Sequence, residues 1–242
     1  MSRYDEVYRR SLQDPDGFWG DAAAALDWSR RWDRVLDLSA SPHGRWFTGG
    51  EINTCWNALD RHADGGRAAQ PALIWDSPVT GQVRVYNYAE LRDAVARAAG
   101  ALRSLGVRQG DRVLLYMPMV PEAAIGMLAC ARLGAIHSVV FGGFAPRELA
   151  TRIDDARPKA ILTASCGVEA QRVIEYLPLL DAAIELASWK PERCVVLQRD
   201  QARAALHPKR DIDWQDWIAA AAPCDCVPVA ATDPLYILYT SG

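Results

Sequence analysis

The sequence predicts an α/β fold in which a largely parallel sheet is flanked by helices. Short apolar strands alternate with helical patterns over residues 112–198 of the 242-residue chain. The strands are continuous and rich in β-branched residues, as is typical of strands that helices cover on both faces. Pro121 and Pro146 stand where a helix tolerates proline, in its first turn. A hydrophobic fraction of 50% provides enough apolar side chains for a large core.

The first 65 residues differ in composition from the rest of the chain. They hold five of the nine tryptophans, within two short helical patterns. Trp28 and Trp32 are four residues apart, and this spacing predicts a shared helix face that docks on the core. A helix over 53–60 and a glycine-containing linker over 63–66 follow. We therefore expect an accessory segment, 1–65, and a second unit, 66–242.

The second unit opens with a hairpin and a helix. Apolar runs at 72–75 and 83–86 flank a turn, which is typical of paired antiparallel strands. Asn87 followed by Glu90 forms a capping box, and apolar residues recur at helical spacing up to Leu105. The alternation then predicts further strands and helices. The strands are 112–117, 135–141, 160–164, 194–198 and 235–239, and the helices are 121–133, 146–156, 171–187 and 214–222.

Composition excludes several classes of protein. A net charge of −3 provides no basic surface for a nucleic-acid backbone. Six cysteines are too few for a disulfide scaffold, and Cys224 with Cys226 alone does not complete a zinc site, so we expect no metal site. The charged start resembles no secretory signal, and Glu122, Arg132 and His137 interrupt the longest apolar stretch. We expect a cytoplasmic protein with small-molecule partners.

Ligands of such sheets bind beyond the carboxyl ends of the strands. Gly142 and Gly143 follow one predicted strand, where two residues without side chains allow a ligand or another segment of backbone to approach. Thr240, Ser241 and Gly242 follow the last strand, as at the start of a phosphate-binding loop. Each feature also has a purely structural explanation, as a tight turn or a strand end. The four histidines do not cluster, so no catalytic triad is expected.

Taken together, the sequence resembles the N-terminal part of short-chain acyl-CoA synthetases, the propionyl- and acetyl-CoA synthetase branch of the adenylate-forming, AMP-binding enzymes. The resemblance is carried by residues 46–62, 106–123, 129–159 and 233–242. Three motifs are more similar to propionyl-CoA synthetases than to the acetyl branch: YMPM at 116–119, RIDDA at 152–156 and the stretch from Cys166. The fold that this implies is the N-terminal subdomain of such a synthetase, incomplete at its C-terminal end.

The resemblance implies a coenzyme A site. Phe141, Gly142 and Gly143 match the family's loop along the pantetheine passage. Arg172 matches a position near the nucleotide end of coenzyme A, where a guanidinium suits a phosphate. Glu169 stands where acetyl-type relatives tend to have a second arginine, so it is either a coenzyme A neighbour or a solvated carboxylate.

The resemblance also implies an ATP site that begins in Thr240, Ser241 and Gly242 and continues beyond them. The family joins a carboxylate to ATP, giving acyl-adenylate and pyrophosphate, and then transfers the acyl group to coenzyme A; magnesium offsets the phosphate charge. Residues 66–242 would form the first part of the AMP-binding domain, cut within the phosphate loop. We expect no catalytic residue in the chain and no activity from it alone.

Three alternatives remain open from the sequence. Acetate could replace propionate as the main substrate. The chain could be a non-catalytic module that binds coenzyme A or a protein partner. A nicotinamide-dependent oxidoreductase is disfavoured because the chain lacks the G-x-G-x-x-G fingerprint.

Overall fold

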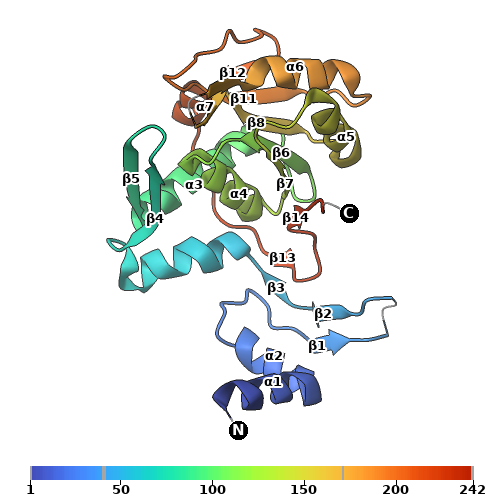
Figure 1. Ribbon diagram of the computed structural model, residues 1–242. Coiled ribbons are helices and arrows are strands. Elements are labelled where there is room, and N and C mark those ends of the chain that lie inside the picture. Colours follow the sequence, from blue (N-terminus) through green and yellow to red (C-terminus); the bar gives the residue numbers. More distant parts are fainter. Residues whose placement is uncertain (1, 40–41, 171, 241–242) are drawn as a thin grey trace.

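The computed structural model describes residues 2–39, 42–170 and 172–240. Its centre is a six-stranded sheet in the order β12-β11-β8-β6-β7-β14, with every neighbouring pair parallel (Figure 1). The strands are β6 (Arg112–Met117), β7 (Ile136–Phe141), β8 (Ala160–Ala164), β11 (Arg193–Leu197), β12 (Asp211–Asp213) and β14 (Tyr236–Ile237). The predicted fold class, a largely parallel sheet flanked by helices, is confirmed.

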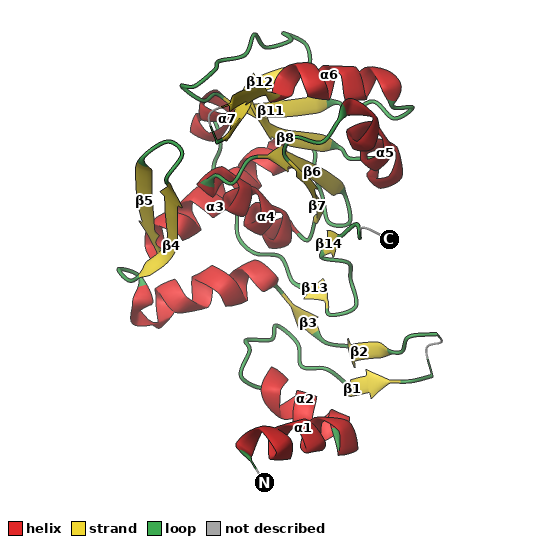
Figure 2. Cartoon of the chain, in the orientation of Figure 1, coloured by secondary structure: helices red, strands yellow, loops and turns green. Residues whose placement is uncertain are grey.

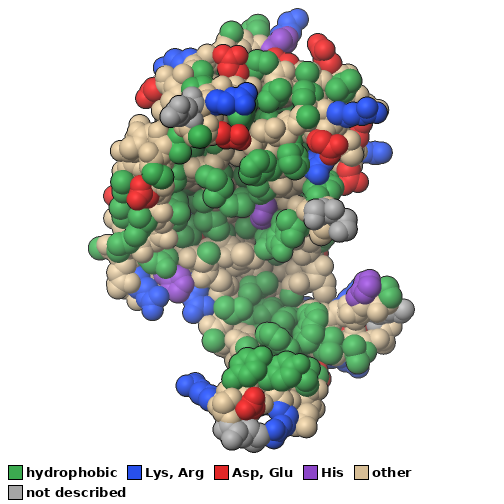
Figure 3. All heavy atoms as spheres, viewed as in Figure 1, with side chains coloured by type: hydrophobic (Ala, Val, Ile, Leu, Met, Phe, Trp, Pro, Cys, Tyr) green, Lys and Arg blue, Asp and Glu red, His purple; other side chains and the backbone are tan. Residues whose placement is uncertain are grey.

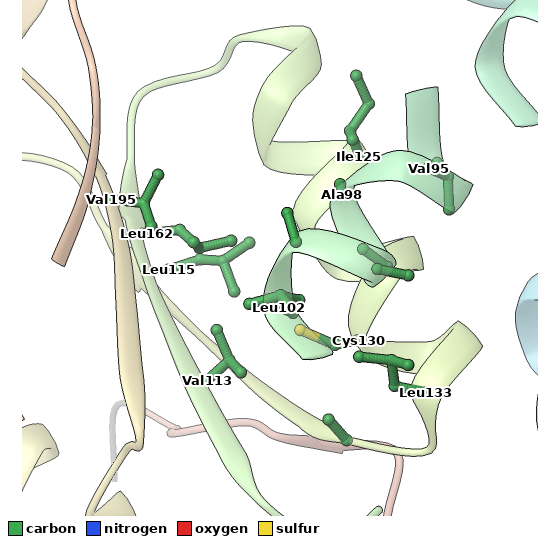
Figure 4. Packing of buried hydrophobic residues seen from close by; sticks show 14 of the residues in the cluster. Val95, Ala98, Leu102, Val113, Leu115, Ile125, Cys130, Leu133, Leu162 and Val195 are labelled. Carbon is green, nitrogen blue, oxygen red and sulfur yellow. The ribbon is translucent and has the colours of Figure 1, made fainter. Parts of the chain in front are cut away.

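Helices cover both faces of this sheet (Figure 2). One face packs against α3 (Tyr88–Ser104), α4 (Pro121–Leu133) and α7 (Trp214–Ala219), and the other against α5 (Pro146–Ala156) and α6 (Tyr176–Leu186). Successive strand residues point to opposite faces. Val113 and Leu115 therefore join the first core, while Leu114 and Tyr116 join the second. Figure 4 shows the first core, with Leu115, Leu162 and Val195 of the sheet facing Leu102 of α3.

The hairpin β4 (Pro71–Ser77) and β5 (Gln82–Asn87) is antiparallel and leads directly into α3. The α3 capping box is present: the Glu90 N–H donates to Asn87 Oδ1 and the Asn87 N–H donates to a Glu90 carboxylate oxygen, both at 2.9 Å. Pro121 and Pro146 begin α4 and α5, as predicted. Gly134 ends α4 at φ +70°, a conformation that glycine adopts without strain.

The N-terminal elements lie at one end of the molecule, away from the sheet (Figure 1). They are α1 (Arg3–Gln13), α2 (Pro15–Ala23), β1 (Arg34–Asp37), β2 (Arg45–Thr48) and β3 (Glu51–Ile52), followed by a helical segment with π-type turns η1 (Trp56–Asp60) and η2 (Ala63–Arg67). Strands β1 and β2 pair antiparallel, and β3 pairs with β13 (Val229–Ala230). The N-terminal segment is thereby tied to a loop near the other end of the chain.

Two predictions about the N-terminal segment are wrong. Trp28 and Trp32 share no helix face, because residues 27–33 are not helical. Their rings, 4.8 Å apart between centroids, pack edge to face and enclose Phe47 instead. The predicted linker at 63–66 lies inside the helical segment, whose geometry breaks only at Gly65 and Gly66.

The predicted helix over 171–187 is shorter in the structure and is preceded by a hairpin. Its predicted start, Gln171, lies outside the described residues, and α6 begins at Tyr176. Strand β9 (Cys166–Glu169) pairs antiparallel with β10 (Arg172–Glu175) ahead of that helix. The β-branched Val173 and Ile174 suit a strand, and Ala170 at φ +51° turns the chain. Helix α7 ends at Ala219 and β14 at Ile237, both earlier than predicted.

Candidate coenzyme A site

A hollow of about 490 Å³ lies at the carboxyl edge of the sheet. Five segments form its wall: the tip of the β4–β5 hairpin, the loop after β6, the end of β7, the β9–β10 hairpin with the start of α6, and Arg199 after β11. Figure 3 shows hydrophobic side chains gathered across the middle of the visible face of the molecule. The hollow brings together three of the predicted residues, Phe141, Gly142 and Glu169.

Phe141 is the last residue of β7 and is 68% exposed. The next turn places its ring centroid 5.9 Å from that of Phe144. An exposed aromatic side chain on the wall of a hollow offers apolar surface to a ligand. Phe141 thus lies on the wall of the hollow, and its contact with a ligand stays a prediction.

Gly142 and Gly143 each leave space that a neighbour uses. A Cβ on Gly142 would lie 2.2 Å from the Tyr176 hydroxyl oxygen, and one on Gly167 of β9 would lie 2.3 Å from the same atom. Gly143 has φ +107° and a Cβ there would lie 3.1 Å from a Glu169 carboxylate oxygen. The two glycines therefore admit Tyr176 and Glu169 of this same chain to the edge of the hollow.

Tyr176 and Tyr116 pack together beneath these glycines, with ring centroids 4.9 Å apart. Burial raises the pKa of Tyr176 to about 12, and the neighbouring Tyr116 and the Glu169 charge add to the rise. Burial also raises the pKa of Tyr116, whose hydroxyl donates to the Phe144 carbonyl at 3.3 Å. Both phenols stay neutral near pH 7, so the Tyr176 hydroxyl can donate a hydrogen bond at the wall of the hollow.

Glu169 and Arg172 stand directly opposite each other in the β9–β10 hairpin. Glu169 contributes to the wall of the hollow, and the exposed Arg172 lies beside it at the hairpin's turn. Glu169 therefore lines the hollow, and Arg172 lies next to it outside the lining. A guanidinium at an exposed rim can meet a phosphate without the cost of burying its charge.

Thr240 follows β14, which runs parallel to β7 with Tyr236 opposite His137. Parallel strands end at the same edge of a sheet, so Thr240 lies beyond the edge that also carries Phe141. Tyr239, just before it, donates its hydroxyl to Asp155 Oδ2 at 2.6 Å and packs under the guanidinium of Arg152. Thr240 itself is exposed, and Ser241 and Gly242 lie outside the described residues.

Sequence reasoning missed Tyr176, Arg199 and the β4–β5 hairpin tip as parts of the wall. Arg199 follows the end of β11, where its Nη1 donates to the Cys166 carbonyl at 3.0 Å and its N–H donates to Ser165 Oγ at 2.9 Å. The rule that ligands bind beyond the carboxyl ends of strands points to this position as well. The hairpin tip carries no comparable signal, because only the folding of the chain brings it to the sheet.

Among the residues that the structure describes, one group could offer three donors to a metal ion: Cys55, Asp60 and Cys226. Arg132 already binds both carboxylate oxygens of Asp60, at 2.7 and 3.0 Å. A second cation beside this guanidinium would meet like-charge repulsion, so the group does not suit a metal ion. Within the described part of the chain, no helix has the length and apolar character needed to cross a membrane.

Two protein-family models match adjoining parts of the chain. The model of the AMP-binding enzyme family matches residues 59–242, and that of the acetyl-coenzyme A synthetase N-terminus matches residues 4–58. An uncharacterized protein of Pseudomonas aeruginosa is 59% identical over 99% of this chain. The mitochondrial acyl-CoA synthetase short-chain family member 3 of Homo sapiens is 46% identical over 100% of the chain, and the propionate–CoA ligase of Salmonella typhimurium is 44% identical over 99%.

The chain covers 38% of the Pseudomonas protein, 35% of the human protein and 38% of the Salmonella ligase. Among solved structures, acetoacetyl-CoA synthetase from Streptomyces lividans matches all of this chain with a TM-score of 0.88 at 27% identity. The match covers 37% of that enzyme. Sequence and structure comparisons thus point to the same group of proteins and to a similar share of their length.

Proposed function

Because the chain belongs to the AMP-binding enzyme family, in the branch of short-chain acyl-CoA synthetases, we propose that the protein joins a short-chain carboxylate to coenzyme A at the expense of ATP. The carboxylate oxygen attacks the α-phosphorus of ATP, and pyrophosphate leaves. The thiol of coenzyme A then attacks the acyl carbon, and AMP leaves with the electron pair of the broken bond. Magnesium would offset the phosphate charge in the first step. We favour propionate as the acid, on the propionyl-type wording at 116–119 and 152–156.

One structural observation supports a part in coenzyme A binding: Phe141, Gly142 and Glu169 of separate segments share the wall of one hollow at the sheet edge. We assign Phe141, Gly142 and Gly143 to the pantetheine chain, which is thin and largely apolar. Arg172, at the exposed rim, would meet a phosphate of the nucleotide end. Glu169 would border this path without contacting a phosphate, because two negative charges repel.

Thr240, with Ser241 and Gly242 beyond the described residues, would open the loop that holds the ATP phosphates. We assign no catalytic residue to the chain. The same proposal divides it into an accessory segment, 1–65, and the first part of the adenylation domain, 66–242. It also takes the protein to be cytoplasmic, with small molecules as its only substrates.

Pyrophosphate release by the whole protein, with acetate or propionate as substrate, tests the proposal. We expect release to need ATP and a carboxylate, acyl-CoA to form, and propionate to give the higher kcat/KM. Arg172→Ala should raise the KM for coenzyme A by about 10- to 150-fold and leave the KM for ATP unchanged, since a charge-assisted hydrogen bond contributes about 1.5–3 kcal/mol.

Arg97→Ala is the matched control, because Arg97 is an arginine of α3 whose partner is Asp93 on the same helix. An unchanged KM for coenzyme A in Arg172→Ala would contradict the assignment of Arg172. Binding of coenzyme A without any acyl-CoA formation would favour a non-catalytic binding module instead.

A further inference from the structure

Two cysteines far apart in the sequence meet where the N-terminal segment joins the core. Cys55 lies in the first turn of the helical segment that contains η1, and Cys226 lies in the irregular stretch between α7 and β13. The sulfur atoms of Cys55 and Cys226 and a carboxylate oxygen of Asp60 lie within 4.8 Å of one another. The candidate coenzyme A site uses none of these groups.

A buried cation lies against this thiol pair. The guanidinium of Arg132, which is 4% exposed, donates from Nη1 to Cys55 Sγ at 3.6 Å while it holds Asp60. The Cys226 thiol has Asp60 Oδ2 at 3.6 Å as a further acceptor. A positive charge beside a sulfur favours the thiolate, which is the form that reacts with oxidants.

The direction of its pKa shift separates Cys55 from the core thiols. The hydrogen bond from Cys226, together with the Arg132 charge, lowers the pKa of Cys55 despite its burial. Burial alone raises the pKa of Cys130 to about 12, and burial is the largest cause that raises the pKa of Cys194 to about 12. The same hydrogen bond and burial raise the pKa of Cys226, so the proton of the pair lies on Cys226 and the negative charge on Cys55. Burial keeps Cys130 and Cys194 in the thiol form, whereas the junction pair can supply a thiolate.

A second hollow gives access to the pair. It has a volume of about 320 Å³ and is lined by Asp27, Trp28, Ser29, Asn53, Trp56, Cys226 and Pro228. Cys226 is partly exposed and forms part of its wall, whereas Cys55 is fully buried behind it. A small oxidant can reach Cys226 from solvent, and Cys55 is in place to react next.

We propose that Cys55 and Cys226 form a redox modification site, at which a peroxide converts the two thiols into a disulfide. The proton of Cys226 passes to the Cys55 thiolate, and the Cys226 sulfur attacks the peroxide. An S–O bond forms, the O–O bond breaks, and the hydroxide that leaves takes up the proton released when the pair ionised, giving one water. The sulfur of Cys55 then attacks the resulting sulfenic acid; the S–S bond forms, the S–O bond breaks and a second water leaves. The two thiol protons end in these waters, and the peroxide takes both electrons.

The surrounding backbone is suited to this bond. Asn53 Nδ2 donates to the Val227 carbonyl at 2.8 Å, and β3 pairs with β13 close by, so the two cysteine-bearing segments already lie side by side. Cys226 lies outside any helix or strand, and rotation of its side chain can bring the sulfurs together. The disulfide would fix the N-terminal segment covalently to the core.

Peptide mapping of the whole protein after brief treatment with hydrogen peroxide tests the proposal. We expect the protein to lose two of its six titratable thiols, one proteolytic peptide pair to be joined through Cys55 and Cys226, and dithiothreitol to release it. The oxidised protein should also unfold at a higher temperature than the reduced protein, since a link between distant residues restricts the unfolded chain.

Cys226→Ser should abolish the cross-link, and Cys224→Ser is the matched control, because Cys224 stands two residues away in the same stretch and should leave the cross-link intact. The mapping of the unaltered protein decides the question even if a variant fails to fold. A disulfide with any other pairing, a stable sulfinic acid in place of a disulfide, or retention of all six thiols would overturn the proposal.

Discussion

The parallel sheet and the N-terminal segment are held together in different ways. Every residue of β8, and all but the first residue of β6, is buried, and α3 buries seven side chains between the sheet and its neighbours. Helix α1 buries none of its residues, and α2 buries only Ala23. In the N-terminal segment the cohesion comes from aromatic rings, with Trp28, Trp32 and Phe47 at centroid distances of 4.8–5.4 Å.

The stability of the N-terminal segment therefore depends on its junction with the core. A region with few buried apolar contacts opens at a lower free energy than the core of the same protein. Its junction includes the Arg132–Asp60 ion pair, the hydrogen bonds of Asn53, the β3–β13 pairing, and Cys55 and Leu59 packed in the core. Substitutions at the junction, in the core and in the aromatic cluster should therefore differ in the free energy of unfolding that they cost and in the elements that they affect.

The largest effect is expected at the junction. Asp60→Asn should lower the free energy of unfolding by about 3–5 kcal/mol, because it leaves the buried Arg132 charge without its partner. Urea unfolding measures this loss. Asp93→Asn removes a carboxylate from an exposed pair on α3 and should cost less than about 0.5 kcal/mol. Equal losses in the two variants would mean that the junction pair contributes no more than a surface pair.

The next largest loss of stability is expected from a truncation in the core. Leu162 of β8 is fully buried against α4, so Leu162→Ala should cost about 2–5 kcal/mol through lost contacts and the cavity that remains. Because the sheet is one cooperative unit, hydrogen exchange should quicken in every core strand. If exchange quickened only near β8, the core would not behave as one unit.

A truncation in the aromatic cluster should cost less stability, and its effect should stay local. Trp32→Ala removes an edge-to-face contact with Trp28 and another with Phe47, each contributing about 0.5–1.5 kcal/mol beyond its buried area. Hydrogen exchange should quicken within β1 and β2 and stay unchanged in β6 and β8. Faster exchange in the sheet would show that the N-terminal segment and the core unfold together.

The smallest effect concerns pH and His137 in β7. Burial lowers the pKa of His137, and its Nδ1 is buried without a hydrogen-bond partner among the described residues. The fold therefore favours the neutral ring. Its contribution to stability is present in full above the unfolded pKa of about 6.5 and is lost as the pH falls from there through the lower folded value.

Unfolding temperatures between pH 7.5 and 5 measure this effect. The unfolding temperature should fall less steeply on acidification in His137→Gln, because the glutamine side chain does not titrate. Exchange within the N-terminal segment should not respond to this substitution. An equally steep decline in the variant would assign the pH dependence to other groups.

The sequence by itself determined the local elements of the core. The Asn87–Glu90 capping box, the prolines that begin α4 and α5, and the apolar runs of β6 and β8 act over a few residues, so their patterns predict the elements directly. The place of Phe141, Gly142 and Gly143 at the end of β7 was predictable in the same way, because the apolar run stops at the glycines.

Only the tertiary structure decided the features that depend on distant residues. The β9–β10 hairpin, the place of Arg199 beside it and the packing of Trp32 on Phe47 all follow from contacts that no local pattern encodes. Cys55 and Cys226 meet across 171 positions of sequence because β3 pairs with β13 and Asp60 pairs with Arg132. A short-range pattern predicts only the helix or strand that a segment forms by itself. The partner of a buried charge or thiol depends on how the whole chain packs.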